Sequence, residues 1–125
     1  VDHPELVSAF AREVAIGANV ARAWVVNIGQ RDATQRIAHF LCELQARLSA
    51  VGAADPNGFV LGATQADIAD AQGLTTVHVN RVLQDLRARG LIRLERRRLT
   101  IVDQARLEGL ALFDPLYLSL GAVAA

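Results

Sequence analysis

Apolar side chains recur along this chain mainly at the alternating three- and four-residue steps of an amphipathic helix. From Pro4 to about Gln30 these steps continue for about three heptads, which predicts one long helix. Gly17, Ala18 and Ala21 would let a partner helix approach closely. We therefore interpret this segment as a dimerisation helix; the alternative is an amphipathic helix that packs on its own domain. The heptad seam consists of Val7, Phe10, Val14, Gly17, Ala21, Trp24 and Ile28.

A second amphipathic helix is predicted from Ala33 to about Ala50, with Asp32 as its N-cap. His39 and Cys42 lie within it at a spacing of three residues, which would suit a shared metal ion. No third ligand lies near them in the sequence, so we expect a buried histidine and an inert thiol instead. The apolar face of this helix consists of Ile37, Phe40, Leu41, Leu44 and Leu48.

The stretch that begins at Thr64 has the pattern of helix, glycine turn and helix. Thr64 is a good N-cap, and Gly73 stands where the chain must turn sharply. Thr75 is the second N-cap, and Gly90 takes the usual position just past a helix end. This is the helix-turn-helix pattern, whose second helix, here 75–89, enters a DNA major groove. The inward face of that recognition helix consists of Val79, Val82, Leu83 and Leu86.

Two short apolar runs, 91–94 and 99–102, flank the charged residues 95–98 and predict a β-hairpin. A hairpin directly after a recognition helix is the wing of a winged helix. Residues 59–61 are a further candidate strand in the loop before the first helix cap. The predicted fold is therefore mainly α: a winged helix-turn-helix with a small β-hairpin wing, preceded by a long dimerisation-type helix.

The end of the chain is predicted to return to the same domain. Asp103 caps a last helix that runs to about Leu112, and the apolar segment 113–118 is expected to pack back on the body. We divide the chain near Asp32, where one helix ends and the next is capped. Residues 1–31 are then the end of a dimerisation or linker helix, and residues 32–125 are the winged helix-turn-helix domain.

The composition excludes several classes of protein. With 52% hydrophobic residues the chain can bury a core, and its single cysteine excludes a disulfide framework or a multi-cysteine metal site. No glycine-rich phosphate loop, HExxH or GxSxG motif is present, so we expect neither an enzyme nor a cofactor in this chain. The sequence also lacks a signal peptide and an apolar run near about 18 residues, so we expect a cytoplasmic protein with no membrane partner. Because no methionine occurs, even at the first position, we expect a fragment of a longer protein.

The net charge of the chain is zero, but its charged residues are unevenly distributed. Residues 81–98 hold seven arginines against Asp85 and Glu95, which leaves a local charge of +5. Residues 1–80 are negative, with a charge of −3. Because a DNA phosphate responds to the local patch rather than to the net charge, the arginines beside the recognition helix favour a nucleic-acid partner.

The chain resembles the C-terminal DNA-binding domain of the cyclic-AMP receptor protein/Fnr (Crp/Fnr) family of bacterial transcription regulators. Family members carry an N-terminal β-rich effector-binding domain, for which this chain has no counterpart, and a long helix that forms the dimer interface. The resemblance implies that residues 4–30 are the end of that helix. The resemblance extends weakly upstream to about Asp32 and downstream to about Thr100. The matching residues, which follow without a gap, are Leu61 to Ala69, Gly73-Leu74-Thr75, Val79, Arg81-Val82-Leu83, Leu86 and Gly90-Leu91-Ile92.

Four residues near the start of the recognition helix are our candidates for reading bases. Arg81 can pair bidentately with guanine O6 and N7, and the resemblance implies the same role for it. Asn80 could read adenine, and Val77 could meet a thymine methyl group. Family members often have Arg-Glu or Val-Glu where this chain has Thr76-Val77, so the glutamate that would accept a cytosine amino proton is absent. We therefore do not expect this chain to share the operator of the best-known members.

Residues around the recognition helix are candidates for phosphate contacts. The hydroxyls of Thr64 and Thr75 could instead be occupied as helix caps, and His78 could be a solvated helix residue. The three arginines of the wing could form an ordinary solvated turn, but beside a recognition helix we favour phosphate contact. The candidates are Thr64, Gln65, Thr75, His78, Arg96, Arg97 and Arg98.

The sequence thus predicts a sequence-specific transcription regulator that binds a palindromic operator as a homodimer, with half-sites about one helical turn apart. Double-stranded DNA and a second copy of the chain are the expected partners, and the resemblance implies RNA polymerase as a further partner of an activator. The alternative is a winged helix that serves as a protein–protein interaction module without specific DNA binding. Such a module would more often expose an apolar patch where this chain has arginines.

Overall fold

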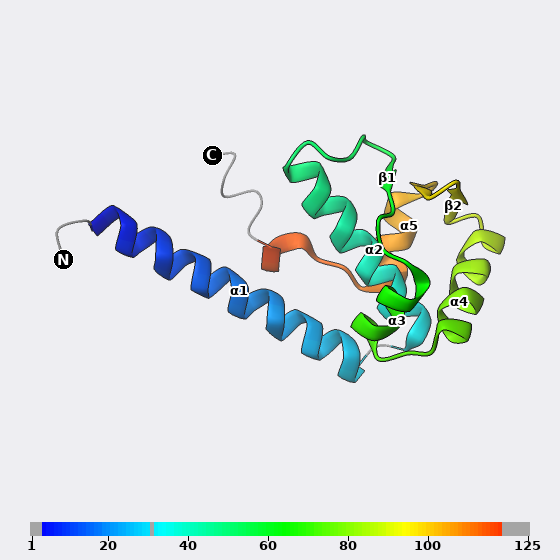
Figure 1. Ribbon diagram of the computed structural model, residues 1–125, viewed down its shortest axis with the longest axis horizontal. Coiled ribbons are helices and arrows are strands. Elements are labelled where there is room, and N and C mark those ends of the chain that lie inside the picture. The colour runs from blue at the N-terminus through cyan, green and yellow to red at the C-terminus, as the bar shows by residue number, and fades with distance from the viewer. Residues whose placement is uncertain (1–3, 31, 119–125) are drawn as a thin grey trace.

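A long helix, α1 (Pro4–Gln30), extends away from a body in which the other elements pack around one core (Figure 1). The computed structural model describes residues 4–30 and 32–118 of the chain. The mainly helical fold with a small antiparallel sheet is the predicted one. In chain order the further elements are α2 (Ala33–Ala50), β1 (Gly58–Val60), α3 (Gln65–Gln72), α4 (Thr76–Ala88), β2 (Ile92–Glu95), β3 (Arg98–Ile101), α5 (Gln104–Ala111) and the 3-10 helix η1 (Pro115–Leu118).

Helix α1 has the predicted length, but its side chains divide into two faces. Trp24, which was placed on the heptad seam, packs against the core of the body instead, with its ring edge-on to that of Phe40 at 6.1 Å between centroids. Three predicted seam positions, Val7, Phe10 and Ile28, lie outside the described side chains. A neighbouring stripe of exposed residues, which we call the exposed α1 stripe, consists of Val14, Gly17, Ala18, Ala21 and Val25.

Helix α2 runs through the core of the body and begins and ends where the sequence predicts. Asp32 forms a capping box with Gln35: each side chain accepts from the other residue's backbone N–H, at 2.8 and 3.2 Å. His39 and Cys42 are buried, at 3% and 1% exposure, as expected. Within the described residues no group of three or more potential metal ligands lies close together.

The sheet has the strand order β1–β3–β2, with both pairs antiparallel. The predicted hairpin is confirmed, but Glu95 and Arg98 belong to its strands, so the turn consists of Arg96 and Arg97 alone. Both turn residues have positive φ, 48° and 68°, as the two-residue turns that match strand twist require. Strand β1 begins at Gly58, one residue before the predicted strand, and adds a third strand to the wing.

The segment after the sheet returns to the body as predicted. Asp103 caps α5, and Leu112 ends it in a left-handed conformation. Phe113 packs on the core, and η1 lies beside α1 and α2 (Figure 1). None of the described helices is long and apolar enough to span a membrane.

Candidate nucleic-acid interface

The first helix of the helix-turn-helix, α3, is capped by a closed pair of hydrogen bonds. Thr64 Oγ1 accepts from the backbone N–H of Asp67 at 3.1 Å, and Asp67 Oδ2 accepts from the backbone N–H of Thr64 at 2.9 Å. The hydrogen bond from the Thr64 backbone N–H, and then one from the Thr64 side chain, lower the pKa of the Asp67 carboxyl, because they favour its charged form. Gly73 then takes a left-handed conformation, with φ at 66°, and ends the helix.

The second helix, α4, is fixed at both ends. Thr75 Oγ1 accepts from the backbone N–H of His78 at 3.1 Å. At the other end Gly90, with φ at 71°, donates to the Arg87 carbonyl, and Leu91 donates to the Leu86 carbonyl. This is the Schellman arrangement, which satisfies the last carbonyls of the helix. The four apolar residues of the predicted inward face are all buried.

The opposite face of α4 is open to solvent and holds the four predicted base readers. Thr76, Val77, Asn80 and Arg81 are all exposed, and their spacing places them on one face around the first turns of the helix. Two further residues, which were not among the predicted base readers, continue this face toward the end of α4. Gln84 and Arg87 are exposed, and Arg87 Nη1 donates to Gln84 Oε1 at 3.4 Å. They lie three and six residues after Arg81, and this helical spacing could have identified them from the sequence.

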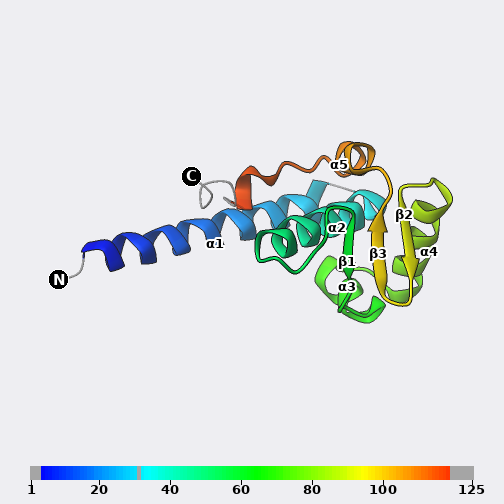
Figure 2. The ribbon, with the colours of Figure 1, turned by 90° about the horizontal axis from the view of Figure 1, so that it is seen from above.

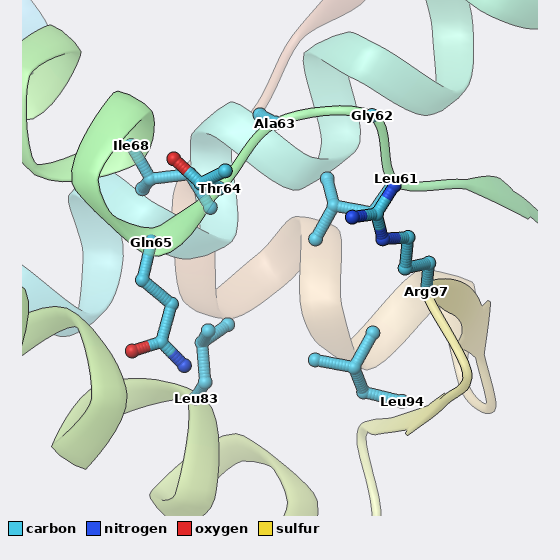
Figure 3. Close-up of a pocket in the computed structure, with 9 residues that line it drawn as sticks. All are labelled: Leu61, Gly62, Ala63, Thr64, Gln65, Ile68, Leu83, Leu94 and Arg97. Atoms are coloured by element: carbon cyan, nitrogen blue, oxygen red, sulfur yellow. The ribbon is translucent and has the colours of Figure 1, made fainter.

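The tip of the wing lies against the start of α3. The backbone N–H of Leu61 donates to the carbonyl of Arg97 at 2.6 Å, and the Arg97 side chain lies beside Leu61 (Figure 3). Thr64, Gln65 and Arg97, three of the predicted phosphate contacts, thereby line one small cavity of about 220 Å³, together with Leu83 of α4. In the ribbon of Figure 2 the tip of the β2–β3 hairpin lies beside α3 and α4.

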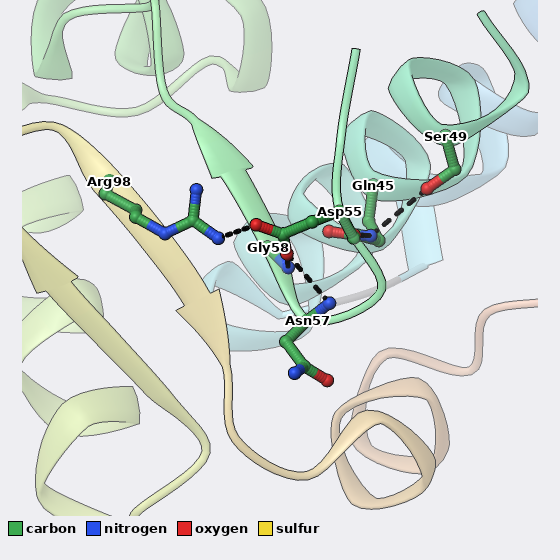
Figure 4. A network of polar contacts seen from close by, with 6 residues as sticks. All are labelled: Gln45, Ser49, Asp55, Asn57, Gly58 and Arg98. Atoms are coloured by element: carbon green, nitrogen blue, oxygen red, sulfur yellow. Dashed lines mark hydrogen bonds and ion pairs between the residues drawn. The ribbon is translucent and has the colours of Figure 1, made fainter. Parts of the chain in front are cut away.

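Arg98 lies apart from this cavity and is held by a carboxylate. Its guanidinium pairs with Asp55 Oδ2, while Asp55 Oδ1 accepts from the backbone N–H groups of Asn57 and Gly58 at 3.0 and 2.9 Å (Figure 4). The pKa of the Asp55 carboxyl is lowered, first by the Asn57 hydrogen bond and then by Arg98. Since Asp55 compensates its charge, Arg98 is a weaker candidate for phosphate contact than Arg96 and Arg97.

The arginines of 81–98 differ in how far their charge is compensated. Arg89 forms a salt bridge to Asp85 at 3.0 Å, and Arg98 pairs with Asp55. In the part of the chain that the structure describes, the other five have no salt bridge, and all are exposed. One of them, Arg93, was missed as a candidate although it stands on β2 opposite Thr100. The uncompensated arginines are Arg81, Arg87, Arg93, Arg96 and Arg97.

The threonine caps remain compatible with phosphate contact. The hydroxyl oxygen of Thr75 accepts a hydrogen bond, and its own O–H can still donate to another acceptor, whereas the Thr64 side chain also bonds the Asp67 carboxyl. The uncapped backbone N–H groups at a helix N-terminus also favour an anion. His78 is half-buried beside the second cap, and Gln65 is half-buried beside the first.

A helix-turn-helix with an arginine-tipped hairpin wing defines the class of winged-helix regulators. Residues 35–110 match the Crp-like helix-turn-helix domain. The chain belongs to this family, which is a family of transcription regulators and not of enzymes. The sequence prediction of the family is thereby confirmed.

Relatives in the family are named as transcription factors. The chain is 33% identical over 106 residues to a probable transcriptional activator of Rhizobium leguminosarum bv. viciae, covering 84% of this chain and 44% of that protein. It is 37% identical over 93 residues to the transcriptional activator protein FnrL of Cereibacter sphaeroides, covering 71% of this chain and 38% of that protein. The chain thus spans less than half the length of these curated relatives.

Solved structures of the family share the fold. The transcriptional regulator TTHB099 of the CRP family from Thermus thermophilus aligns with a TM-score of 0.72 and 28% identity, over 90% of this chain and 56% of that one. FixK2 from Bradyrhizobium japonicum aligns with a TM-score of 0.69 and 28% identity, over 86% of this chain and 50% of that one. These alignments extend over more of the chain than the matched domain, so they also include part of α1 or of the C-terminal segment.

Proposed function

We propose that the chain is the DNA-binding part of a transcription regulator that binds a palindromic operator as a dimer. The observation that carries this proposal is the exposed face of α4, on which Arg81 stands with Thr76, Val77 and Asn80 in the first two turns of the helix. A helix presented in this way can enter a major groove with its first turns against the base edges. The names of the relatives further support a role in transcriptional activation.

In this proposal Arg81 binds guanine through its O6 and N7 atoms, because a guanidinium fits those two acceptors bidentately. Asn80 reads an adjacent adenine, and Val77, at 69% exposure, meets a thymine methyl group. Thr76 lies at the edge of the same face. Because position 77 carries no carboxylate, cytosine is not selected there.

The phosphate contacts lie on both sides of the recognition helix. Arg96 and Arg97 at the wing tip hold one backbone, and Thr64 and Gln65 at the start of α3 lie next to Arg97 in the same cavity. The hydroxyl of Thr75 and the side chain of His78 hold the backbone beside the start of α4. Such contacts position the domain and carry most of the salt dependence, but they do not specify sequence.

Dimerisation is proposed to use the exposed α1 stripe. Val14 and Val25 are 57% and 70% exposed on it, and the residues between them are small, which allows two helix backbones to approach closely. Although Trp24 packs on the body, the residues of the stripe are exposed and are therefore open to a second copy. A two-fold dimer of this kind requires a palindromic operator.

The protein-interaction alternative is less well supported. Val77 is the one large apolar side chain exposed on α4, and it is surrounded by polar residues and arginine. A docking surface for a protein would expose a larger continuous apolar patch. The uncompensated arginines instead match the regular negative charge of a DNA backbone.

Selection from random double-stranded DNA tests the proposed function. The 125-residue chain is incubated with the library, and the enriched sequence is then titrated beside a scrambled one at two salt concentrations. We expect an inverted repeat, bound at least about a thousandfold more tightly than the scrambled DNA. Weak binding without enrichment, removed by salt, would contradict sequence-specific recognition and favour the protein-interaction alternative.

A further inference from the structure

Glu43 is a buried carboxylate that receives hydrogen bonds from both ends of the described chain. It lies on α2 with 2% exposure. The indole Nε1 of Trp24, on α1, donates to its two oxygens at 2.8 and 3.0 Å. The hydroxyl of Tyr117, on η1, donates to Oε1 at 2.6 Å. We call Glu43, Trp24 and Tyr117 the Glu43 clasp.

Within the clasp the buried carboxylate of Glu43 has hydrogen-bond donors as partners. Burying an unpaired carboxylate is costly, and here two neutral donors and the guanidinium of Arg47, at 3.6 Å from Oε2, offset that cost. Burial, and then the hydrogen bond to Glu43, raise the pKa of the Tyr117 hydroxyl. Tyr117 therefore keeps its proton and remains a donor.

Aromatic contacts give the clasp a defined geometry. The ring of Tyr117 stacks on that of His39 at 5.8 Å between centroids, and Phe113 meets both rings edge-on. On the other side Trp24 meets Phe40 edge-on. The three segments that come together in this way, α1, α2 and η1, also lie side by side in Figure 1.

The direction of α1 relative to the body depends on such contacts. Only residues 31 and 32 separate α1 from α2 in the sequence, and Asp32 has an extended backbone, so the two helices do not continue into each other. Trp24 of α1 is held by the clasp, while the residues of the neighbouring exposed α1 stripe are open to solvent. A change at the clasp would therefore turn the body, and α4 with it, relative to α1.

We propose that Glu43 is a positioning residue for operator binding, which fixes the angle between α1 and the helix-turn-helix through Trp24 and Tyr117. This inference rests on the proposed dimer through α1. If two α1 helices pair, the angle at each clasp sets the distance and rotation between the two copies of α4. The clasp then determines which spacing between half-sites the dimer prefers, although its three residues lie on α1, α2 and η1 and not on α4.

The variants Trp24→Phe and Tyr117→Phe test this inference, singly and together. Each removes one hydrogen-bond donor. Tyr117→Phe keeps its ring, and Trp24→Phe keeps an aromatic but smaller ring, so the body should still fold. The matched control is Ser49→Ala, which removes a hydrogen bond of 3.1 Å between Gln45 and Ser49 on the same helix, beside the Asp55 loop (Figure 4). Each protein is titrated with a single half-site and with inverted repeats whose spacer changes by one base pair at a time.

We expect all variants to bind the single half-site as the wild type does. For the double variant, the preference for the best spacer over the next should fall at least about tenfold, since each lost hydrogen bond to a charged group contributes at least about that factor. The Ser49→Ala control should keep the wild-type preference. If the double variant keeps the preference, or loses affinity for half-site and repeat alike, Glu43 only stabilises the body and the inference is wrong. A wild type that binds half-sites alone would contradict the proposed dimer and, with it, this inference.

A distance measurement without DNA gives an independent test. Spin labels at Arg12→Cys on α1 and Arg106→Cys on α5 report the angle between α1 and the body. The labelled protein is diluted with unlabelled chain. Both positions are exposed. The distance distribution should be narrow in the otherwise wild-type protein and at least about twice as broad after Trp24→Phe and Tyr117→Phe. An unchanged distribution would overturn the inference.

Discussion

The backbone N–H of Leu61 donates a 2.6 Å hydrogen bond to the carbonyl of Arg97, so the tip of the wing is joined to the residue that leads into α3. Through this bond the wing and the helix-turn-helix form one surface. It also supports the left-handed backbone of Arg97, a conformation that is unfavourable for a residue with a side chain. The guanidinium of Arg97 lies beside Leu61, at the cavity that Thr64 and Gln65 also line (Figure 3).

Arg97→Ala should weaken binding to every DNA sequence by a similar factor. The wing-tip arginine contacts phosphate in our proposal, so its loss should reduce the slope of log affinity against log salt by about 1. Titrations at several salt concentrations measure both effects. The control is Arg106→Ala, because Arg106 is exposed on α5, on the side of the body away from α3 (Figure 2). Equal losses in both variants would show only an effect of net charge.

Arg81→Ala should cost roughly 1–3 kcal/mol of binding free energy and remove the base preference at one position per half-site. Arg81→Lys keeps the charge but cannot pair bidentately, so it should restore affinity in part and base preference hardly at all. Competition between operators with each base at that position measures the preference. A lower affinity with unchanged preference would assign Arg81 to a phosphate instead.

Gly58→Ala should destabilise the fold by about 1–3 kcal/mol, as overpacking of a core usually does. A Cβ at this position would collide with the Leu99 carbonyl on the paired strand. The matched control is Gly109→Ala in α5, where a Cβ meets no atom within 4 Å and should stabilise the helix by about 0.5–1 kcal/mol. Chemical denaturation of both variants measures the difference, and equal effects would contradict the close approach of β1 to β3.

Cys42 should resist thiol reagents at pH 8 until the chain unfolds. Burial, and to a smaller extent the charge of Glu108, raise the pKa of the thiol to about 12, and the side chain is 1% exposed. The reactive thiolate is therefore almost absent in the folded state. Labelling with a chromogenic disulfide, followed with and without denaturant, measures this. Rapid reaction of the native protein would show that the core around α2 opens easily.

The elements that local chemistry specifies could be predicted from the sequence. The caps at Thr64, Thr75 and Asp103 and the glycine turn at Gly73 place helix boundaries within a residue or two, because each depends on one side chain or on one backbone conformation. Pairing of β1 with β3 was not foreseen, because it joins residues about 40 positions apart and no local pattern encodes it. The clasp at Glu43 escaped prediction for the same reason.

The candidate interface was predictable where it follows helix periodicity. The exposed positions of α4, Arg81 among them, are the complement of the buried face, so one pattern gives both. The contacts of the wing could not be predicted from helix periodicity. The sequence does not distinguish its three successive arginines. In the structure the strand register places Arg98 beside Asp55 and leaves Arg96 and Arg97 in the turn. The direction of Trp24 likewise depended on a tertiary contact.

Methylation interference on the selected operator tests the entry of α4 into the major groove most directly. Guanine N7 lies in the major groove, and in our account it accepts from Arg81 in each half-site. We expect methylation of N7 at one guanine per half-site, placed symmetrically, to abolish binding by the wild type and to have little effect on the remaining binding of Arg81→Ala. Methylation of adenine N3, in the minor groove, should interfere much less. If N7 methylation leaves wild-type binding intact throughout the operator, α4 does not read the major groove and the central claim is wrong.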